Sequence, residues 1–226
     1  GNIGAAVSAI VLGAFAAPAV KGGFVGVMIM GFRRAAFSNE AGVGTAAIAH
    51  SAARTEHPVA EGIVALHEPF IDTVVICTMT ALVLIFTGHH QMDGVAGAQL
   101  TAEAFGSVVS WFPYLLTLAI FLFAFSTLIS YSYYGLKCFD YLLGDLFESH
   151  LGGRAMGAHL YRAIFLSFTV IGAASSLGAV MAFSDMIVLS LAFPNTLGLY
   201  IMAGEVKKDL DAYLKGIRNG TIAPKT

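Results

Sequence analysis

The sequence predicts an all-α integral membrane protein that crosses the membrane five times, with a first span that is broken. Hydrophobic residues make up 57% of the chain and charged residues only 12%, whereas soluble domains carry about 25% charged residues. The mean hydropathy of +0.78 also indicates that most of the chain lies in a lipid bilayer. A formal net charge of −2 without any basic block gives no indication of a nucleic-acid partner.

A polar, glycine-bearing stretch interrupts the first apolar segment, which covers residues 22–53. The stretch reads Phe-Ser-Asn-Glu-Ala-Gly-Val-Gly-Thr over residues 37–45. Non-helical backbone at membrane depth has to line a cavity or be buried in protein, and interrupted hydrophobic segments indicate a transporter's binding site. Asn39 and Glu40 supply side-chain oxygens, and two glycines let the backbone unwind at little steric cost. The alternative is a tight cytoplasmic loop between two ordinary helices.

Unwinding at this stretch exposes two kinds of backbone group. Free carbonyl oxygens can hold a cation, and free N–H groups at the start of the second half-helix suit a carboxylate. The broken segment is therefore the expected binding region of the chain.

The segment before the broken span is apolar but short. Residues 2–17 are mostly small and apolar, and a span needs about 20 such residues. We therefore expect residues 1–21 to form an external interfacial or re-entrant segment. Since residue 1 is not Met, we expect it to be an internal position of a longer chain.

The second span is predicted at residues 61–87, and its polar side chains lie in the first half. They are His67, Glu68 and Asp72. Residues 88–111 contain no Lys or Arg and form the next connection. Within this connection, residues 100–109 are expected to form a short helix on the membrane surface.

The third span is predicted at residues 112–134, which carry no charged side chain. The hydroxyls of Ser126, Thr127 and Ser130 cluster toward its end. In a membrane helix such hydroxyls either bond back to the preceding turn or supply oxygen ligands to a hard cation. Residues 137–161 are expected to be a second connection.

The last two spans are separated by a very short turn. They are predicted at residues 162–177 and 180–204, with the turn at residues 178–179. Pro194 and Asn195 lie in the middle of the fifth span, where a proline predicts a kink.

The distribution of basic residues predicts the orientation. Most of the twelve Lys and Arg residues lie in alternate connections and in the tail at residues 205–226. By the positive-inside rule the tail is cytoplasmic, and the connection at residues 88–111 is external. The expected location is the plasma or inner membrane of the cell.

Two other functional classes fit the sequence less well than transport. An intramembrane hydrolase could bind zinc through residues such as His50 and Glu68, but the His-Glu-x-x-His and Gly-x-Ser-x-Gly motifs are both absent from the sequence. A passive channel would place polar residues along one helix face, whereas here they concentrate at one depth. No organic cofactor is expected, and two cysteines indicate no disulfide framework.

The stretch at residues 32–46, which includes the Phe-Ser-Asn-Glu-Ala-Gly run, resembles the signature of the alanine or glycine:cation symporter family. Members of this family are sodium-coupled transporters of small amino acids. The resemblance covers nearly the whole chain, and its further matches are His50 and residues 57–58, 70–73, 77–78, 80–82, 123–127, 133–135, 194–195 and 204–206. The chain departs from the family pattern at Ala35, Ala47 and Tyr131, where Gly, Pro and Trp are usual.

This resemblance implies the leucine-transporter fold, which contains two inverted five-helix repeats. The five spans of residues 22–204 match the second repeat. This chain would then be the C-terminal half of the transporter, and the missing N-terminal half of the same polypeptide would be its partner. The implied function is sodium-coupled symport of alanine or glycine by alternating access, with sodium as a co-transported ligand.

The resemblance also implies which residues bind the two ligands. The substrate would lie near mid-membrane between the two broken helices, and its contacts in this chain would be Phe37, Ser38, Asn39, Gly42, Thr127 and Tyr131. Sodium would bind the neighbouring hydroxyls of Ser126 and Thr127, with Ser130 one turn further along.

Overall fold

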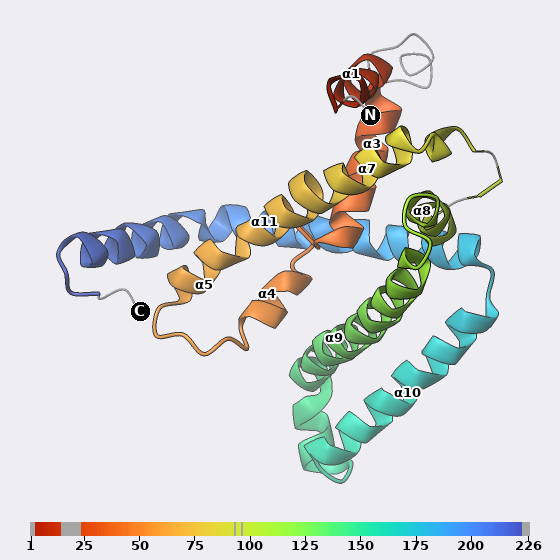
Figure 1. The fold of residues 1–226 in the computed structure, drawn as a ribbon. Helices are drawn as coiled ribbons and strands as arrows, with labels where there is room; N and C mark the ends of the chain where they lie inside the picture. The colour runs from red at the N-terminus through yellow and green to blue at the C-terminus, as the bar shows by residue number, and fades with distance from the viewer. Residues whose placement is uncertain (1–2, 15–23, 93, 96, 223–226) are drawn as a thin grey trace. The chain divides into compact units, whose positions relative to one another are not determined.

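The computed structural model describes residues 3–14, 24–92, 94–95 and 97–222, and all regular elements among them are helices (Figure 1). The predicted all-α class is therefore confirmed. Four helical stretches are long and apolar enough to cross a membrane: Pro58–Phe86, Phe112–His150, Arg154–Ala174 and Leu177–Arg218. They contain most of the second to fifth predicted spans, and the membrane boundaries stay predictions.

The helices pack into two compact units. The first unit comprises residues 1–34 and 70–133. Its elements are α1 (Ile3–Ala14), the start of α3 (Phe24–Ser38), the π-helix η1 (Phe70–Cys77), α7 (Thr78–Phe86), the 3₁₀ turn η2 (His89–Gln91), α8 (Gly97–Gly106) and the first part of α9 (Phe112–His150).

In this first unit, α7 packs against α1 and α8, and Ala6 of α1 and Ala104 of α8 are buried. The helix predicted at residues 100–109 is present but begins and ends three residues earlier, as α8. It ends there because the corner into α9 is tight. The ring of Phe105 stacks on Phe112 at 4.5 Å, and a Cβ on Gly106 would lie only 2.9 Å from a Pro113 side-chain carbon.

The second unit comprises residues 35–69 and 134–226. Its elements are the end of α3, α4 (Thr45–His50), α5 (Pro58–Ala65), α6 (His67–Pro69), the rest of α9, α10 (Arg154–Ala174) and α11 (Leu177–Arg218). Its buried apolar cluster joins Ala36 of α3, Val43 and Val188 of α11. This unit contains the interrupted stretch of the first predicted span.

Most of the connection predicted at residues 137–161 is helical, and its place outside the membrane stays a prediction. α9 continues to His150, α10 begins at Arg154, and only three residues join them. Gly152 and Gly153 have φ angles of 88° and 93°, which favour glycine, and the Gly153 N–H donates to the Phe147 carbonyl at 2.8 Å. The chain therefore reverses tightly, and the start of α10 folds back along the last part of α9, where Tyr161 meets Phe139 (Figure 1).

The turn between the last two helices also differs from its prediction. It lies at Ser175 and Ser176, and the predicted turn residues Gly178 and Ala179 are in the first turn of α11. The reason is a side-chain cap: the Ser176 hydroxyl accepts a hydrogen bond from the Ala179 N–H at 3.4 Å. Such a cap satisfies a backbone donor that the helix leaves unpaired.

Candidate functional site

The predicted interruption of the first apolar segment is present. α3 ends at Ser38 and α4 begins at Thr45. Between them Glu40, Gly42 and Gly44 have φ angles of 56°, 82° and 96°, in the left-handed region that residues with a Cβ rarely adopt. Glu40 is the one non-glycine residue with a positive φ in the part of the chain that the structure describes. The helix is therefore interrupted where the sequence predicts, and the choice between a broken membrane span and a loop between two helices stays a prediction.

The break is held against α11 by Asn195. The Asn195 side-chain N–H donates to the Gly42 carbonyl at 2.9 Å. A Cβ on Gly44 would lie 2.8 Å from the Asn195 side-chain oxygen, so only glycine fits at this close approach. Val43, between the two glycines, is buried at 5% exposure. One polar side chain in an apolar helix thus anchors the irregular backbone.

Two further hydrogen bonds stabilise the break internally. The Asn39 side-chain oxygen accepts from the Ala41 N–H at 3.1 Å, and the Glu40 carboxylate accepts a short hydrogen bond from the Thr45 hydroxyl. The carboxylate near the start of α4 is therefore the chain's own. α4 has only six residues, so its dipole is small, and the expectation that its N-terminus holds a substrate carboxylate has no support here.

An open cavity of about 440 Å³ lies beside the break within the second unit. It is lined by side chains from the break, α4 to α6 and α9: Ser38, Asn39, Glu40, Ala46, Ala49, His50, Ala53, Glu61, Glu68 and Tyr134. Three carboxylates and no Lys or Arg are among these described lining residues. A cavity lined by one sign of charge raises the local concentration of the opposite ion, so this cavity favours cations.

His50 connects α4 to the two short helices that follow it. Its Nδ1 lies 2.7 Å from Oε1 of Glu61 on α5, and its Nε2 lies 3.4 Å from Oε2 of Glu68 on α6. The His50 side chain is 22% exposed and that of Glu61 26%. The imidazole is thus shared between two carboxylates on the cavity wall.

The predicted substrate and sodium residues divide between the two units. Phe37 and Ser38 form the last turn of α3, and Asn39 and Gly42 belong to the break, all in the second unit. The predicted sodium ligands and Tyr131 lie on α9 in the first unit. Ser38 and Asn39 do line one cavity, and the meeting of the two groups in one site stays a prediction.

The three candidate sodium ligands differ from five other hydroxyls of the apolar helices, although Ser132 and Ser184 resemble them in making no bond within their described helices. The hydroxyls of Thr117, Ser167, Thr169, Ser190 and Thr196 each donate to the carbonyl four residues earlier. In the described part of the chain, the hydroxyls of Ser126, Thr127 and Ser130 make no such bond. Their oxygens are therefore available to a ligand.

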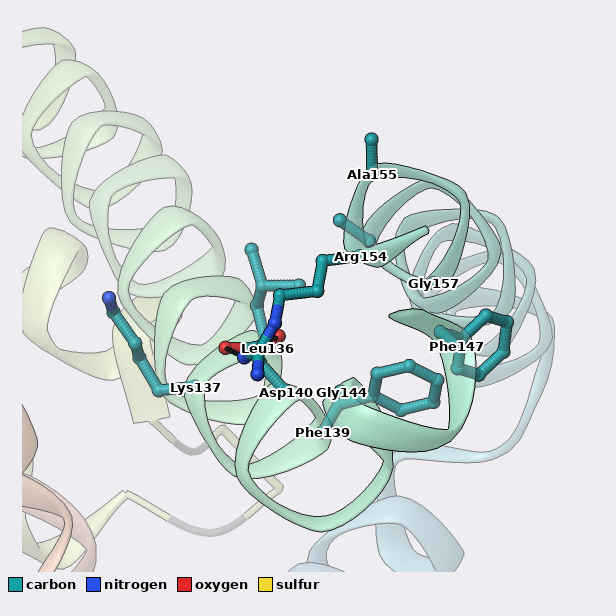
Figure 2. Close-up of a pocket in the computed structure, with 10 residues that line it drawn as sticks. Leu136, Lys137, Phe139, Asp140, Gly144, Phe147, Arg154, Ala155 and Gly157 are labelled. Atoms are coloured by element: carbon teal, nitrogen blue, oxygen red, sulfur yellow. Dashed lines mark hydrogen bonds and ion pairs between the residues drawn. The ribbon is translucent and has the colours of Figure 1, made fainter. Parts of the chain in front are cut away.

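A second cavity, of about 320 Å³, lies at the α9–α10 turn. Figure 2 shows Arg154 reaching from α10 toward Asp140 of α9. The guanidinium lies 3.2 Å from Asp140 and 2.6 Å from both Asp145 and Glu148. Lys137 also lines this cavity. Because the Arg154 guanidinium is already matched by three acids, we assign the Arg154 side of the cavity to the helix hairpin.

Asn195 and Glu61 are functional candidates that the sequence interpretation did not identify as such. The sequence places Asn195 in a kink and among the matches to the family, and it places Glu61 at the start of a span, in neither case with a role in the site. A signal was present in one case, because an amide in a mainly apolar helix needs a hydrogen-bond partner. Its partner, 153 positions away, could not be read from the pattern.

The chain matches the sodium:alanine symporter family over residues 1–226. It is 38% identical over 196 residues to the sodium/alanine symporter AgcS of Methanococcus maripaludis, covering 85% of this chain and 41% of the relative. It is 32% identical to the probable sodium/glutamine symporter GlnT of Bacillus subtilis (93% and 43% covered) and 28% identical to the sodium/proton-dependent alanine carrier protein of Bacillus sp. PS3 (92% and 49% covered).

The chain spans less than half the length of these curated relatives. No solved structure matches it significantly. The family match over all residues and the similarity to curated transporters agree with the resemblance carried by the interrupted stretch. The chain belongs to the sodium:alanine symporter family, whose members are transporters and not enzymes.

Proposed function

We propose that this chain is part of a sodium-coupled symporter for a small neutral amino acid, alanine or glycine, that works by alternating access. Family membership supports coupled amino-acid transport over the hydrolase and channel alternatives. Two of these relatives are named for alanine and one for glutamine. The choice of alanine or glycine as the substrate is therefore a more specific proposal than amino-acid transport.

The break between α3 and α4 is the observation that carries this proposal. A zwitterion and a cation that leave water need polar partners throughout the membrane. The break places backbone and side-chain oxygens next to an open cavity, and Asn195 holds this backbone in a defined shape. Phe37, Ser38, Asn39 and Gly42 would contact the substrate from this side.

Sodium would bind on α9 and couple to the substrate. Ser126 and Thr127 are the proposed ligands, with Ser130 one turn further along, because their hydroxyl oxygens are not used within the helix. Thr127 and Tyr131 are four residues apart and share a helix face, so one face would serve both ligands. Coupling requires that each ligand raises the affinity of the other by the same factor.

The proposal includes a partner and an orientation. The matched relatives are about twice the length of this chain. We propose that an N-terminal repeat of the same polypeptide completes the site, as in the leucine-transporter fold. The basic tail at residues 205–226 would face the cytoplasm. Rocking of one group of helices around a fixed site would then expose the site to each side in turn.

The test is uptake of labelled alanine by liposomes containing the full-length protein that includes this chain. An inward sodium gradient should drive accumulation above equilibrium, and unlabelled glycine should compete more strongly than glutamine. Residues 1–226 alone should not accumulate alanine, because the N-terminal repeat would be absent. Equilibration of alanine without any effect of sodium would show a passive pathway and contradict the proposal.

A further inference from the structure

The positions of His50, Glu61 and Glu68 determine how many protons these three side chains carry together. A neutral imidazole has one N–H and one nitrogen lone pair. Both ring nitrogens of His50 nevertheless face a carboxylate oxygen, at 2.7 Å and 3.4 Å. A lone pair facing an ionised carboxylate is repelled, so the observed arrangement requires one additional proton on the ring or on one of the two carboxyl groups.

The surroundings of this group allow a proton to come and go. The group lines an open cavity, so solvent can deliver or accept the proton. The other titratable groups on the cavity wall are Glu40 of the break, whose carboxylate is bonded to Thr45, and Tyr134 of α9. Nδ1 of His67, next to Glu68, lies 3.2 Å from the carbonyl oxygen of Ile63 in the preceding helix α5.

The group also lies where a proton can affect the break. α4 has six residues, and both of its ends are tied by a carboxylate. At its start the Thr45 hydroxyl donates to Glu40, and at its end His50 contacts Glu61 and Glu68. Loss of the additional proton leaves a lone pair against a carboxylate, so that one of the two contacts at the end of α4 is lost.

We propose that His50, Glu61 and Glu68 form a proton-binding site, and that the bound proton fixes α4 and thereby the break beside it. A proton taken from water in the cavity completes both contacts of the imidazole, and its return to water releases α4 from one of the two helices. The site would make uptake depend on pH. This dependence of uptake rests on the proposed transport function, whereas proton binding rests on the positions of the three side chains.

The first experiment measures hydrogen exchange of the backbone amides of α4 in the full-length protein, between about pH 5 and pH 8, where histidine changes charge. After correction for the intrinsic exchange rates, α4 should lose protection as the pH rises. H50Q should abolish this change, and E61Q should reduce it. H67Q is the matched control, because this histidine contacts the backbone carbonyls of Ile63 and Val64 and no carboxylate among the described residues, and it should behave as the wild type.

The second experiment measures sodium-driven alanine uptake over the same pH range at a constant sodium gradient. The initial rate should change with pH in the wild type and in H67Q, and it should be independent of pH in H50Q. If H50Q does not fold, E68Q serves instead, because in this variant His50 keeps its shorter contact, the one to Glu61.

Two results would overturn the proton site: protection of α4 that does not change with pH in the wild type, or a change that H50Q and E68Q retain in full. Absence of sodium-driven uptake in the wild type would instead contradict the proposed transport function. The exchange experiment would still decide on the proton site, because it does not depend on transport.

Discussion

Asn195 on α11 donates a hydrogen bond from its side-chain nitrogen to the carbonyl oxygen of Gly42, 2.9 Å away and 153 positions earlier in the chain. Gly42 lies outside the helices, so its carbonyl has no helical N–H partner, and the Asn195 amide lies on a mainly apolar helix. In a membrane, each group would otherwise need a hydrogen bond from water or another chain. This one bond therefore connects the irregular backbone of the proposed binding region to a long, regular helix.

Asn195→Asp should weaken the break. The substitution keeps the size of the side chain but replaces the N–H donor by an oxygen, which repels the Gly42 carbonyl when the carboxyl is ionised. Loss of one such hydrogen bond costs about 1 kcal/mol, and more where an acceptor is left unsatisfied. We expect a lower midpoint of thermal unfolding for the full-length protein in detergent, together with slower alanine uptake.

Thr196→Val provides the control for this change. Thr196 is the next residue and its hydroxyl donates only to the Ala192 carbonyl of its own helix. Its loss should leave both the midpoint and the uptake close to the wild-type values. Equal effects of the two substitutions would show that the contact with Gly42 has no special role.

The two glycines of the break should respond differently to alanine. Both have positive φ, which costs a residue with a Cβ about 1–2 kcal/mol. At Gly42 a Cβ would meet nothing within 4 Å, whereas at Gly44 it would lie 2.8 Å from the Asn195 side chain. Gly44→Ala should therefore destabilise the protein more than Gly42→Ala, as measured by thermal unfolding.

A double substitution separates strain from steric conflict at Gly44. Asn195→Ala removes the atoms that a new Cβ would meet, so Gly44→Ala should cost less in that background than in the wild type. Gly198→Ala on α11 is the control, because it has no positive φ and no atom within 4 Å of a new Cβ. A larger loss for Gly42→Ala than for Gly44→Ala would contradict the close packing of Asn195 on the break.

The sequence predicted the break well because its signals are local. Polar residues and glycines inside an apolar segment are visible in a short window, and the observed interruption falls between Ser38 and Thr45. The helix boundaries outside the apolar core were predicted poorly. α9 continues as a helix to His150, because charged side chains continue a helix as well as apolar ones do. The hydrophobic pattern indicates how far a segment stays apolar and does not indicate the length of the helix.

Contacts between distant parts of the chain could not be predicted. Asn195 has no sequence feature that names Gly42 as its partner, and His50 could have faced any of several acids. Gly178 predicted a turn, but the turn lies before it, at Ser175 and Ser176. The Ser176 hydroxyl caps α11 by accepting a backbone N–H, and this cap stabilises the helix start more than the weak turn preference of glycine opposes it. The sequence thus predicted residue types for the site, and the structure added the partners.

Arg154 should determine how firmly the α9–α10 turn is closed. Its guanidinium is the shared partner of Asp140, Asp145 and Glu148, so Arg154→Gln would leave three carboxylates close together. Hydrogen exchange at residues 151–153 should become faster, because like charges repel and the hairpin loses its ion pairs. High salt should have a smaller effect of the same sign on the wild type, since these groups are exposed and screened.

Arg162→Gln is the control, because it makes the same change in net charge on the same helix at an exposed arginine that forms no ion pair with the described residues. It should not alter exchange at the turn. If Arg154→Gln leaves exchange at residues 151–153 unchanged, the three ion pairs do not hold the turn, and the two turn glycines alone close it.

The proposed sodium ligands on α9 can be tested through the sodium dependence of transport. Thr127→Val keeps the shape of the side chain and removes one hydroxyl, and Ser126→Ala removes the neighbouring one. Sodium prefers oxygen ligands, so each substitution should raise the sodium concentration that gives half-maximal alanine uptake by the full-length protein. The apparent affinity for alanine should fall as well, because coupling between two ligands is reciprocal.

Thr117→Val is the matched control on the same helix. Its hydroxyl already donates to the Pro113 carbonyl at 2.8 Å, so it should contribute to the helix and not to an ion site, and the half-maximal sodium concentration should stay at the wild-type value. Couplings between ligand sites typically amount to 5–150-fold, so changes within about twofold for both Thr127→Val and Ser126→Ala would show no sodium site. In that case the two hydroxyls would have a structural role only, and the cation would have to bind elsewhere, with the oxygens of the break as the next candidates.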